Sequence, residues 1–241
     1  SSQYVAPPHY GGGRVGALCP YVYCAGDPVN CVDPDGKRYK TEIKDGVVII
    51  AANYYCPNKE SYESAQQAAK FWNDKSSQFT ADGMPVLFLL TVETDNKTAR
   101  MNANIDSSAG NYYEVVQDGT MHEGDNSNGG YVSDQIQVVR SRSKTDTPAH
   151  EIGHSLGLIH EDNDTNNLMS PASSTRVGDN IDPIQIKTIL NNSGKEPAKD
   201  YRGFPAGRGT NVNTGNFRKV NTNNIDTLKI DKSKIGPLLC L

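Results

Sequence analysis

The chain has 241 residues, of which 36% are hydrophobic and 22% are charged, and its formal net charge is −4 at pH 7. A chain of this length can bury one sizeable core. Its lysines and arginines form no basic stripe, which argues against nucleic acid as a partner. Its longest apolar runs, such as residues 47–52 and 86–91, are too short to span a bilayer.

The first residues carry no basic start followed by an apolar run, so no signal peptide is visible in them. Either the protein stays inside the cell, or the sequence belongs to a longer chain that carries its own export signal. The five cysteines stand at positions Cys19, Cys24, Cys31, Cys56 and Cys240. No pair has the spacing of a zinc knuckle, and we expect mostly free thiols with at most one or two disulfides.

The first half of the chain predicts two strands and a helix. Residues 1 to about 40 are rich in Gly, Pro, Tyr and Cys, and the run Val47–Ala52 after them predicts a buried strand. Residues 59–74 predict a helix, because apolar side chains fall at helical spacing on one face: Tyr62, Ala65, Ala69 and Trp72. Trp72 is the only tryptophan, and we expect it to anchor the core. The run Pro85–Val92 is the strongest strand signal.

Two further strands are predicted at residues 112–117 and 131–139. Between them lies a long polar loop, residues 122–130. Asp125 and neighbouring carbonyls in its acidic part, residues 123–128, are oxygen donors that could hold calcium. The loop matches no EF-hand pattern, so we favour a solvated loop over a calcium site.

Two later helices are predicted from proline near their starts. The first begins at Thr147-Pro148, with Thr147 as the cap and Pro148 at the first helical position. The second begins at Asp182-Pro183 and runs to about residue 192, where Gly194 follows to stop it. From about residue 196 the chain is rich in Asn, Gly and Thr, so we expect residues 196–241 to form an irregular tail.

Residues 150–160 read His-Glu-Ile-Gly-His-Ser-Leu-Gly-Leu-Ile-His. His150 and His154 are four residues apart, so on a helix both imidazoles leave the same face and can reach one zinc ion at about 2.0–2.1 Å. Glu151 lies beside the first of them. Zinc lowers the pKa of a bound water to about 7, so this carboxylate is placed to act as the general base.

The other two fixed positions of the motif complete a zinc site. Gly157 ends the helix, because glycine adopts a positive φ without steric cost and lets the chain turn sharply. The turn then brings His160 back as a third ligand. Three protein ligands leave a position open for water, as in catalytic sites, whereas structural sites have four. This pattern would arise by chance roughly once in 100,000 chains of such composition, so we set coincidence aside.

The motif HExxHxxGxxH resembles that of the metzincin clan of zinc endopeptidases. In that clan a methionine turn follows the third histidine and forms an apolar floor beneath the metal. The segment Asn167-Leu168-Met169-Ser170-Pro171 places Met169 nine residues after His160. This spacing and the Leu-Met-x-Pro sequence look most like the matrixin branch. The resemblance implies a Met-turn at Met169 and a protein or peptide substrate.

The chain also departs from the clan's branches. No tyrosine follows Met169 at short distance, as in astacin-like members, and no cysteine-switch propeptide of the matrixin kind is visible. The second, structural zinc site of matrixins needs several histidines. Only His9 and His122 lie outside the motif, so we expect one catalytic zinc ion and no second site.

Residues 20–36 read Pro-Tyr-Val-Tyr-Cys-Ala-Gly-Asp-Pro-Val-Asn-Cys-Val-Asp-Pro-Asp-Gly. As local structure they read as two proline-containing turns joined by a short strand. They also resemble the closing segment of the bacterial RHS-repeat core. That resemblance implies a boundary, with residues 1–38 as an RHS-like segment and 39–241 as a variable C-terminal domain. Such domains are often toxins, which implies export within a larger chain to the cell surface or beyond, and a cognate inhibitor or immunity protein.

Together these observations predict an α/β (α+β) metzincin-like domain: a twisted mixed sheet with a backing helix and an active-site helix. We expect substrate to pair with an edge strand near Gly129–Asp134. Two alternatives stay open. One is a secreted nutritional protease unrelated to toxin delivery. The other is a non-catalytic RHS-type surface or adhesion protein, against which the intact Glu151 argues.

Overall fold

The computed structural model divides the chain into two units, Ser1–Pro34 and Asp35–Leu241. It describes only residues of the second unit: 37–94, 97–106, 109–121, 129–132, 135–171, 176–192, 208–211 and 225–227. The RHS-like segment therefore lies outside the described residues, and the domain boundary at residue 38 stays a prediction. In this part of the chain no helix is long and apolar enough to cross a membrane.

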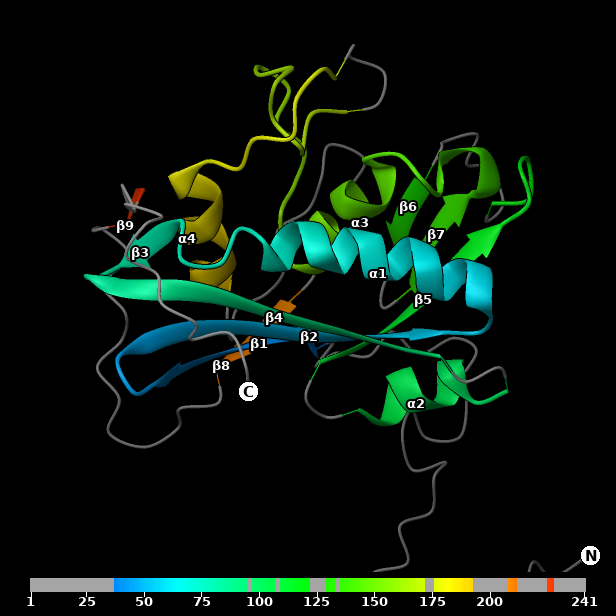
Figure 1. Ribbon diagram of the computed structural model, residues 1–241, viewed down its shortest axis with the longest axis horizontal. Coiled ribbons are helices and arrows are strands. Elements are labelled where there is room, and N and C mark those ends of the chain that lie inside the picture. The colour runs from blue at the N-terminus through cyan, green and yellow to red at the C-terminus, as the bar shows by residue number, and fades with distance from the viewer. Residues whose placement is uncertain are drawn as a thin grey trace, which may run out of the picture. The chain divides into compact units, whose positions relative to one another are not determined.

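A mixed sheet of nine strands forms the centre of the described unit (Figure 1). In chain order the strands are β1 Lys37–Lys44, β2 Val47–Cys56, β3 Phe79–Ala81, β4 Met84–Thr94, β5 Gly110–Val116, β6 Gly129–Val132, β7 Gln135–Val139, β8 Arg208–Asn211 and β9 Ile225–Thr227. Their main path runs β6-β7-β5-β2-β4-β3-β9, while β1 pairs with β2 and with β8. The sheet is the predicted twisted mixed sheet.

The central strand pairs are parallel and the outer ones are mostly antiparallel. β2 pairs in parallel with β4 and β5, and β5 pairs in parallel with β7. Both β6 on β7 and β3 on β4 are antiparallel. β2 and β4 are visible in the sequence as continuous apolar runs, although in β4 buried Val86, Phe88 and Leu90 alternate with more exposed residues.

Four α-helices pack on this sheet: α1 Lys59–Asn73, α2 Ala99–Ile105, α3 Thr147–Ser155 and α4 Pro183–Asn192. A short 3-10 helix, Arg140–Arg142, precedes α3. In Figure 1, α1, α3 and α4 lie on one side of the sheet and α2 lies on the other. α1 is the predicted backing helix, and its start is capped by Asn58, whose side chain accepts a hydrogen bond from Ser61 N.

Trp72 is the predicted core anchor, and it joins α1 to the active-site helix α3. Its side chain is fully buried. Its indole Nε1 donates a hydrogen bond of 2.9 Å to the carbonyl of Ala149 on α3. On the other side its ring packs at 5.4 Å, centroid to centroid, on Phe88 of β4. Buried tryptophan normally satisfies its N–H in this way, and here the bond fixes α3 against the sheet.

Besides α2, β1 and β3, which no prediction covered, the structure differs from the predicted elements in three places. Residues 131–139 form two antiparallel strands, β6 and β7, instead of one. The tail expected to be irregular contributes β8, which pairs with β1, and β9, which pairs with β3. The two tail strands add to the outer edges of β1 and β3, and they are polar, without the apolar alternation that the sequence could reveal. The third difference is the cap of α3, which is Asp146, with Thr147 as the first helical residue.

Candidate active site

The motif residues lie on α3 and on the turn that ends it. Gly157 has a φ of +88°, as predicted for the residue that ends the helix. Its N–H donates to His154 O at 2.9 Å, and Leu158 N donates to Gly153 O at 3.1 Å. These two bonds make the Schellman arrangement of a helix end. The turn reverses the chain so that His160 returns toward α3.

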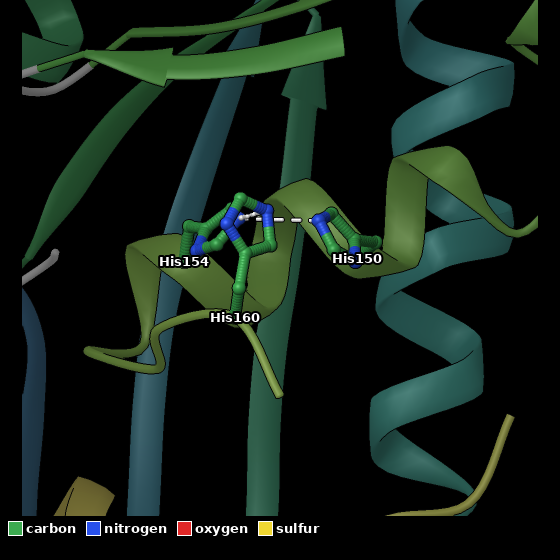
Figure 2. A group of neighbouring side chains, drawn as sticks. All are labelled: His150, His154 and His160. Carbon is green, nitrogen blue, oxygen red and sulfur yellow. Dashed lines mark hydrogen bonds between the residues drawn. The ribbon is translucent and has the colours of Figure 1, made fainter. Parts of the chain in front are cut away.

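The three histidines of the motif converge on one point (Figure 2). His154 Nε2 lies 3.1 Å from His150 Nε2 and 3.3 Å from His160 Nε2. Two nitrogens bound at about 2.05 Å to a tetrahedral zinc ion would be about 3.3 Å apart. The observed spacing therefore fits a zinc ion held by three nitrogens. His150 is buried, whereas the other two are half-buried, so the site opens toward solvent on their side.

Backbone carbonyls orient two of the three imidazole rings. His150 Nδ1 lies 2.7 Å from Leu168 O, and His154 Nδ1 lies 2.8 Å from Leu158 O. A carbonyl oxygen only accepts hydrogen bonds, so a ring that bonds to either carbonyl carries its proton on Nδ1 and keeps the Nε2 lone pair for a metal. The turn at Gly157 thus has two roles. It returns His160 toward α3, and it supplies the Leu158 carbonyl that orients His154.

Burial lowers the pKa of His150 well below its ordinary value. The neighbouring His154, Arg176 and His160 lower the pKa further, while the hydrogen bond to the Leu168 carbonyl acts in the opposite direction. The imidazole is therefore neutral at neutral pH. This is the form in which histidine binds a metal.

Glu151 is a residue of α3, and its side chain lies against the edge strand β6. Its side chain is buried, with 5% of its surface exposed. Gly129, the first residue of β6, lies so close that a Cβ there would stand 2.7 Å from Glu151 Oε1 and 2.9 Å from Thr147 Cγ2. The absence of a side chain at Gly129 is what leaves room for the carboxylate.

Met169 lies in the core next to the active-site helix. It is fully buried, and a Cβ added at Gly153 of α3 would collide with its Sδ atom. The Met169 carbonyl accepts a hydrogen bond of 2.9 Å from Glu161 N, directly after the third histidine. The segment around Met169 therefore packs beneath both parts of the motif, in the place where the resemblance puts a Met-turn.

Asn167 anchors the Met169 segment to α4. Its side chain is fully buried. Its Oδ1 accepts hydrogen bonds of 2.9 Å from Met169 N and from Gln185 Nε2, while its Nδ2 donates to Gln185 Oε1 and Asp182 Oδ2 at 3.1 Å. All four hydrogen bonds of the buried amide are satisfied inside the protein, so α4 holds the segment in place.

The structure thus brings together the predicted residues His150, Glu151, His154, Gly157, His160 and Met169. The loop considered for calcium and His122 lie outside the described residues, as does His9. Cys56 has a free, buried thiol, and burial raises its pKa to about 12, so it is unreactive. Sequence reasoning missed Arg176, and it did not predict the contacts of Gly129 with Glu151 or of Asn167 with Gln185, because these contacts are made only by the fold.

Residues 46–202, more than half of the chain, match the family described as metallo-peptidase family M12. None of the curated proteins compared with the chain matches it. The chain belongs to metallo-peptidase family M12 and is a zinc metalloendopeptidase. This family confirms the metzincin-type assignment, while the likeness of the Met169 segment to the matrixin branch stays a resemblance.

Proposed function

We propose that this M12 metallopeptidase hydrolyses peptide bonds with one zinc ion held by His150, His154 and His160 and with Glu151 as the general base. The observation that carries the proposal is the convergence of the three Nε2 atoms, at 3.1 and 3.3 Å, at the spacing of a tetrahedral zinc site. Chelation leaves a coordination position open, as catalytic zinc sites do.

When bound, the zinc ion acts as a Lewis acid that makes water acidic enough to lose a proton near neutral pH. In this proposal the Glu151 carboxylate accepts the proton of the attacking water and returns it to the leaving amine nitrogen. Its buried position between α3 and β6 limits the orientations that the carboxylate can take. The imidazoles of His150 and His154 are held by the Leu168 and Leu158 carbonyls, so they need no reorientation to bind metal.

We place the substrate along β6. Among the described strands β6 pairs only with β7, so it lies at the edge of the sheet, where an extended peptide can add as a further strand. Gly129, at the start of this strand, lies directly against Glu151. A peptide that pairs with β6 would therefore run past the general base, as the proposed chemistry requires.

The metal assignment predicts that protein purified without chelator contains about one zinc ion per chain. His160→Ala should bind zinc much more weakly, because it removes one of three ligands while leaving α3 intact. Elemental analysis and titration against a chelator measure both effects. Ile159→Ala is the matched control, since Ile159 is the exposed neighbour of His160 and contributes no ligand. Zinc near zero that added metal does not restore would refute the assignment.

We further propose that the peptidase is the C-terminal effector domain of an RHS-repeat protein and is exported as part of that larger chain. The support is the sequence of residues 20–36 alone. A secreted nutritional protease is the competing context, and a neighbouring gene for a small inhibitor would favour the effector. Membership of a peptidase family argues against the non-catalytic adhesion alternative.

The same proposal predicts that residues before Asp35 are dispensable for catalysis. β1 begins at Lys37, so a chain that starts at Asp35 keeps the whole strand, whereas one that starts at Arg38 shortens it. The chain from Asp35 should fold, bind zinc and cleave peptides at a rate close to that of the full chain. Circular dichroism, zinc analysis and a peptide assay test this. An insoluble or inactive product, beside an active full chain, would show that the first segment is part of the protease fold.

A further inference from the structure

Arg176 is a buried arginine beside the metal site. Its side chain is 6% exposed, whereas that of its ion-pair partner Asp146 is 43% exposed. Arg176 Nε donates to Asp146 Oδ2 at 2.6 Å. On its inner side Nη1 donates to Leu168 O at 3.0 Å and Ser170 O at 3.2 Å, and lies 2.6 Å from His150 Nδ1.

The ion pair alone does not explain why Arg176 is buried. Withdrawing a guanidinium from water is costly unless its donors are satisfied, and a pair with a half-exposed aspartate could form at the surface. The inner contacts instead tie together two segments far apart in the sequence. Asp146 caps α3, and the carbonyls of Leu168 and Ser170 flank Met169. Arg176 therefore connects the start of the active-site helix to the Met169 segment.

The Leu168 carbonyl is the point where Arg176 meets the metal site. Its oxygen has two lone pairs, so it can accept from both Arg176 Nη1 and His150 Nδ1. If His150 donates to Leu168, its Nε2 is free to bind metal. If His150 Nδ1 instead accepted from Arg176, the ring proton would move to Nε2 and block the metal. The two arrangements predict opposite effects of removing Arg176.

We propose that Arg176 is a positioning residue that holds the Leu168 carbonyl where it orients His150 for zinc. This inference rests on the proposed role of His150 as a ligand. Arg176 touches neither substrate nor metal, and it acts through the carbonyl that both side chains share. Its donors contact Asp146, Leu168 and Ser170, so the guanidinium holds the Leu168 carbonyl from a position directly beside the imidazole.

The test is zinc affinity, measured by competition with a chelator at a temperature where circular dichroism shows every variant folded. Arg176→Ala should weaken zinc binding about 10-fold, the lower end of what outer-shell partners contribute. Asp146→Asn is the matched control, because it breaks the ion pair and leaves the contacts to both carbonyls. Its loss of affinity should be much smaller. Unchanged or tighter binding by Arg176→Ala, or an equal loss in Asp146→Asn, would overturn the proposal.

Two further measurements test the proposal even if Arg176→Ala does not fold. Arg176→Lys retains the charge but cannot reach Asp146 and both carbonyls at once, so its affinity should fall between those of the parent and Arg176→Ala. A lysine variant with parental affinity would contradict the proposal even if the alanine variant failed to fold. Nitrogen-15 NMR of the zinc-free protein should show His150 protonated at Nδ1. Protonation at Nε2 would mean that Arg176 donates to the ring, against the proposal.

His150→Ala separates this inference from the proposed function. Loss of zinc in His150→Ala together with unchanged affinity in Arg176→Ala would defeat the positioning role alone. Parental affinity in His150→Ala would defeat the ligand assignment itself.

Discussion

Glu151→Gln should keep about one zinc ion per chain and lower kcat by about 10²–10⁴-fold, the usual cost of losing a general base. Glutamine preserves the size of the side chain and its place between α3 and β6. The amide cannot take a proton from water, so binding should be kept and the chemical step lost. Steady-state kinetics on a good protein substrate, with zinc analysis of the same preparation, measures both quantities.

Glu161→Gln is the matched control for that experiment. Glu161 directly follows His160, and its Oε1 accepts a hydrogen bond of 3.2 Å from Asn163 N, which an amide oxygen can also accept. Its activity should stay near that of the parent, so a loss specific to Glu151 cannot be blamed on a changed carboxylate near the metal. Parental turnover in Glu151→Gln would remove Glu151 from the mechanism. Loss of zinc in that variant would show that Glu151 acts on the metal site's structure instead.

Local sequence predicted the metal site because almost all of its geometry is local. The spacing of His150 and His154 fixes their common helix face, and Gly157 fixes the turn that returns His160. The helices α1 and α4 and the apolar strands β2 and β4 could also be predicted, because the residue pattern that indicates each of them is continuous in the chain. Each of these features needs no knowledge of what packs against it.

The support around the ligands could not be predicted, because it comes from residues distant in sequence. Arg176 and Leu168 reach His150 only after the Met169 segment folds back onto α3. The amide of Asn167 finds its distant hydrogen-bond partners, Asp182 and Gln185, only when the start of α4 lies beside it. Its polarity alone would suggest an exposed loop, and nothing local shows that it is fully buried.

Some strand boundaries were predicted wrongly for a related reason. Residues 131–139 are predicted as one strand, but Ser133 and Asp134 interrupt the apolar residues, and β6 and β7 lie antiparallel to each other. β8 and β9 form by pairing with the edges of β1 and β3, and the sequence of the tail alone does not show this pairing. The hairpin matters for function, because it places Gly129 of β6 against the general base.

Gly129→Ala should lower kcat by about 10²-fold, the scale expected when a catalytic group moves by about 1 Å. The added Cβ would stand 2.7 Å from Glu151 Oε1 and 3.0 Å from its Cγ, so the carboxylate must move away. Gly129 lies in a strand without a positive φ, so the backbone itself tolerates alanine. The added Cβ would also stand 2.9 Å from Thr147 Cγ2, and both neighbours are buried, so we expect some loss of stability. Zinc content should change little while turnover falls.

A double-mutant cycle with Glu151→Gln decides whether this loss acts through the general base. If it does, Gly129→Ala should cost far less in the Glu151→Gln background than in the parent, because the displaced group is already inactive. Thermal unfolding and zinc analysis of all four proteins exclude a general loss of structure. Equal, additive losses in the two backgrounds would mean that Gly129 serves substrate binding on β6 and not the position of Glu151.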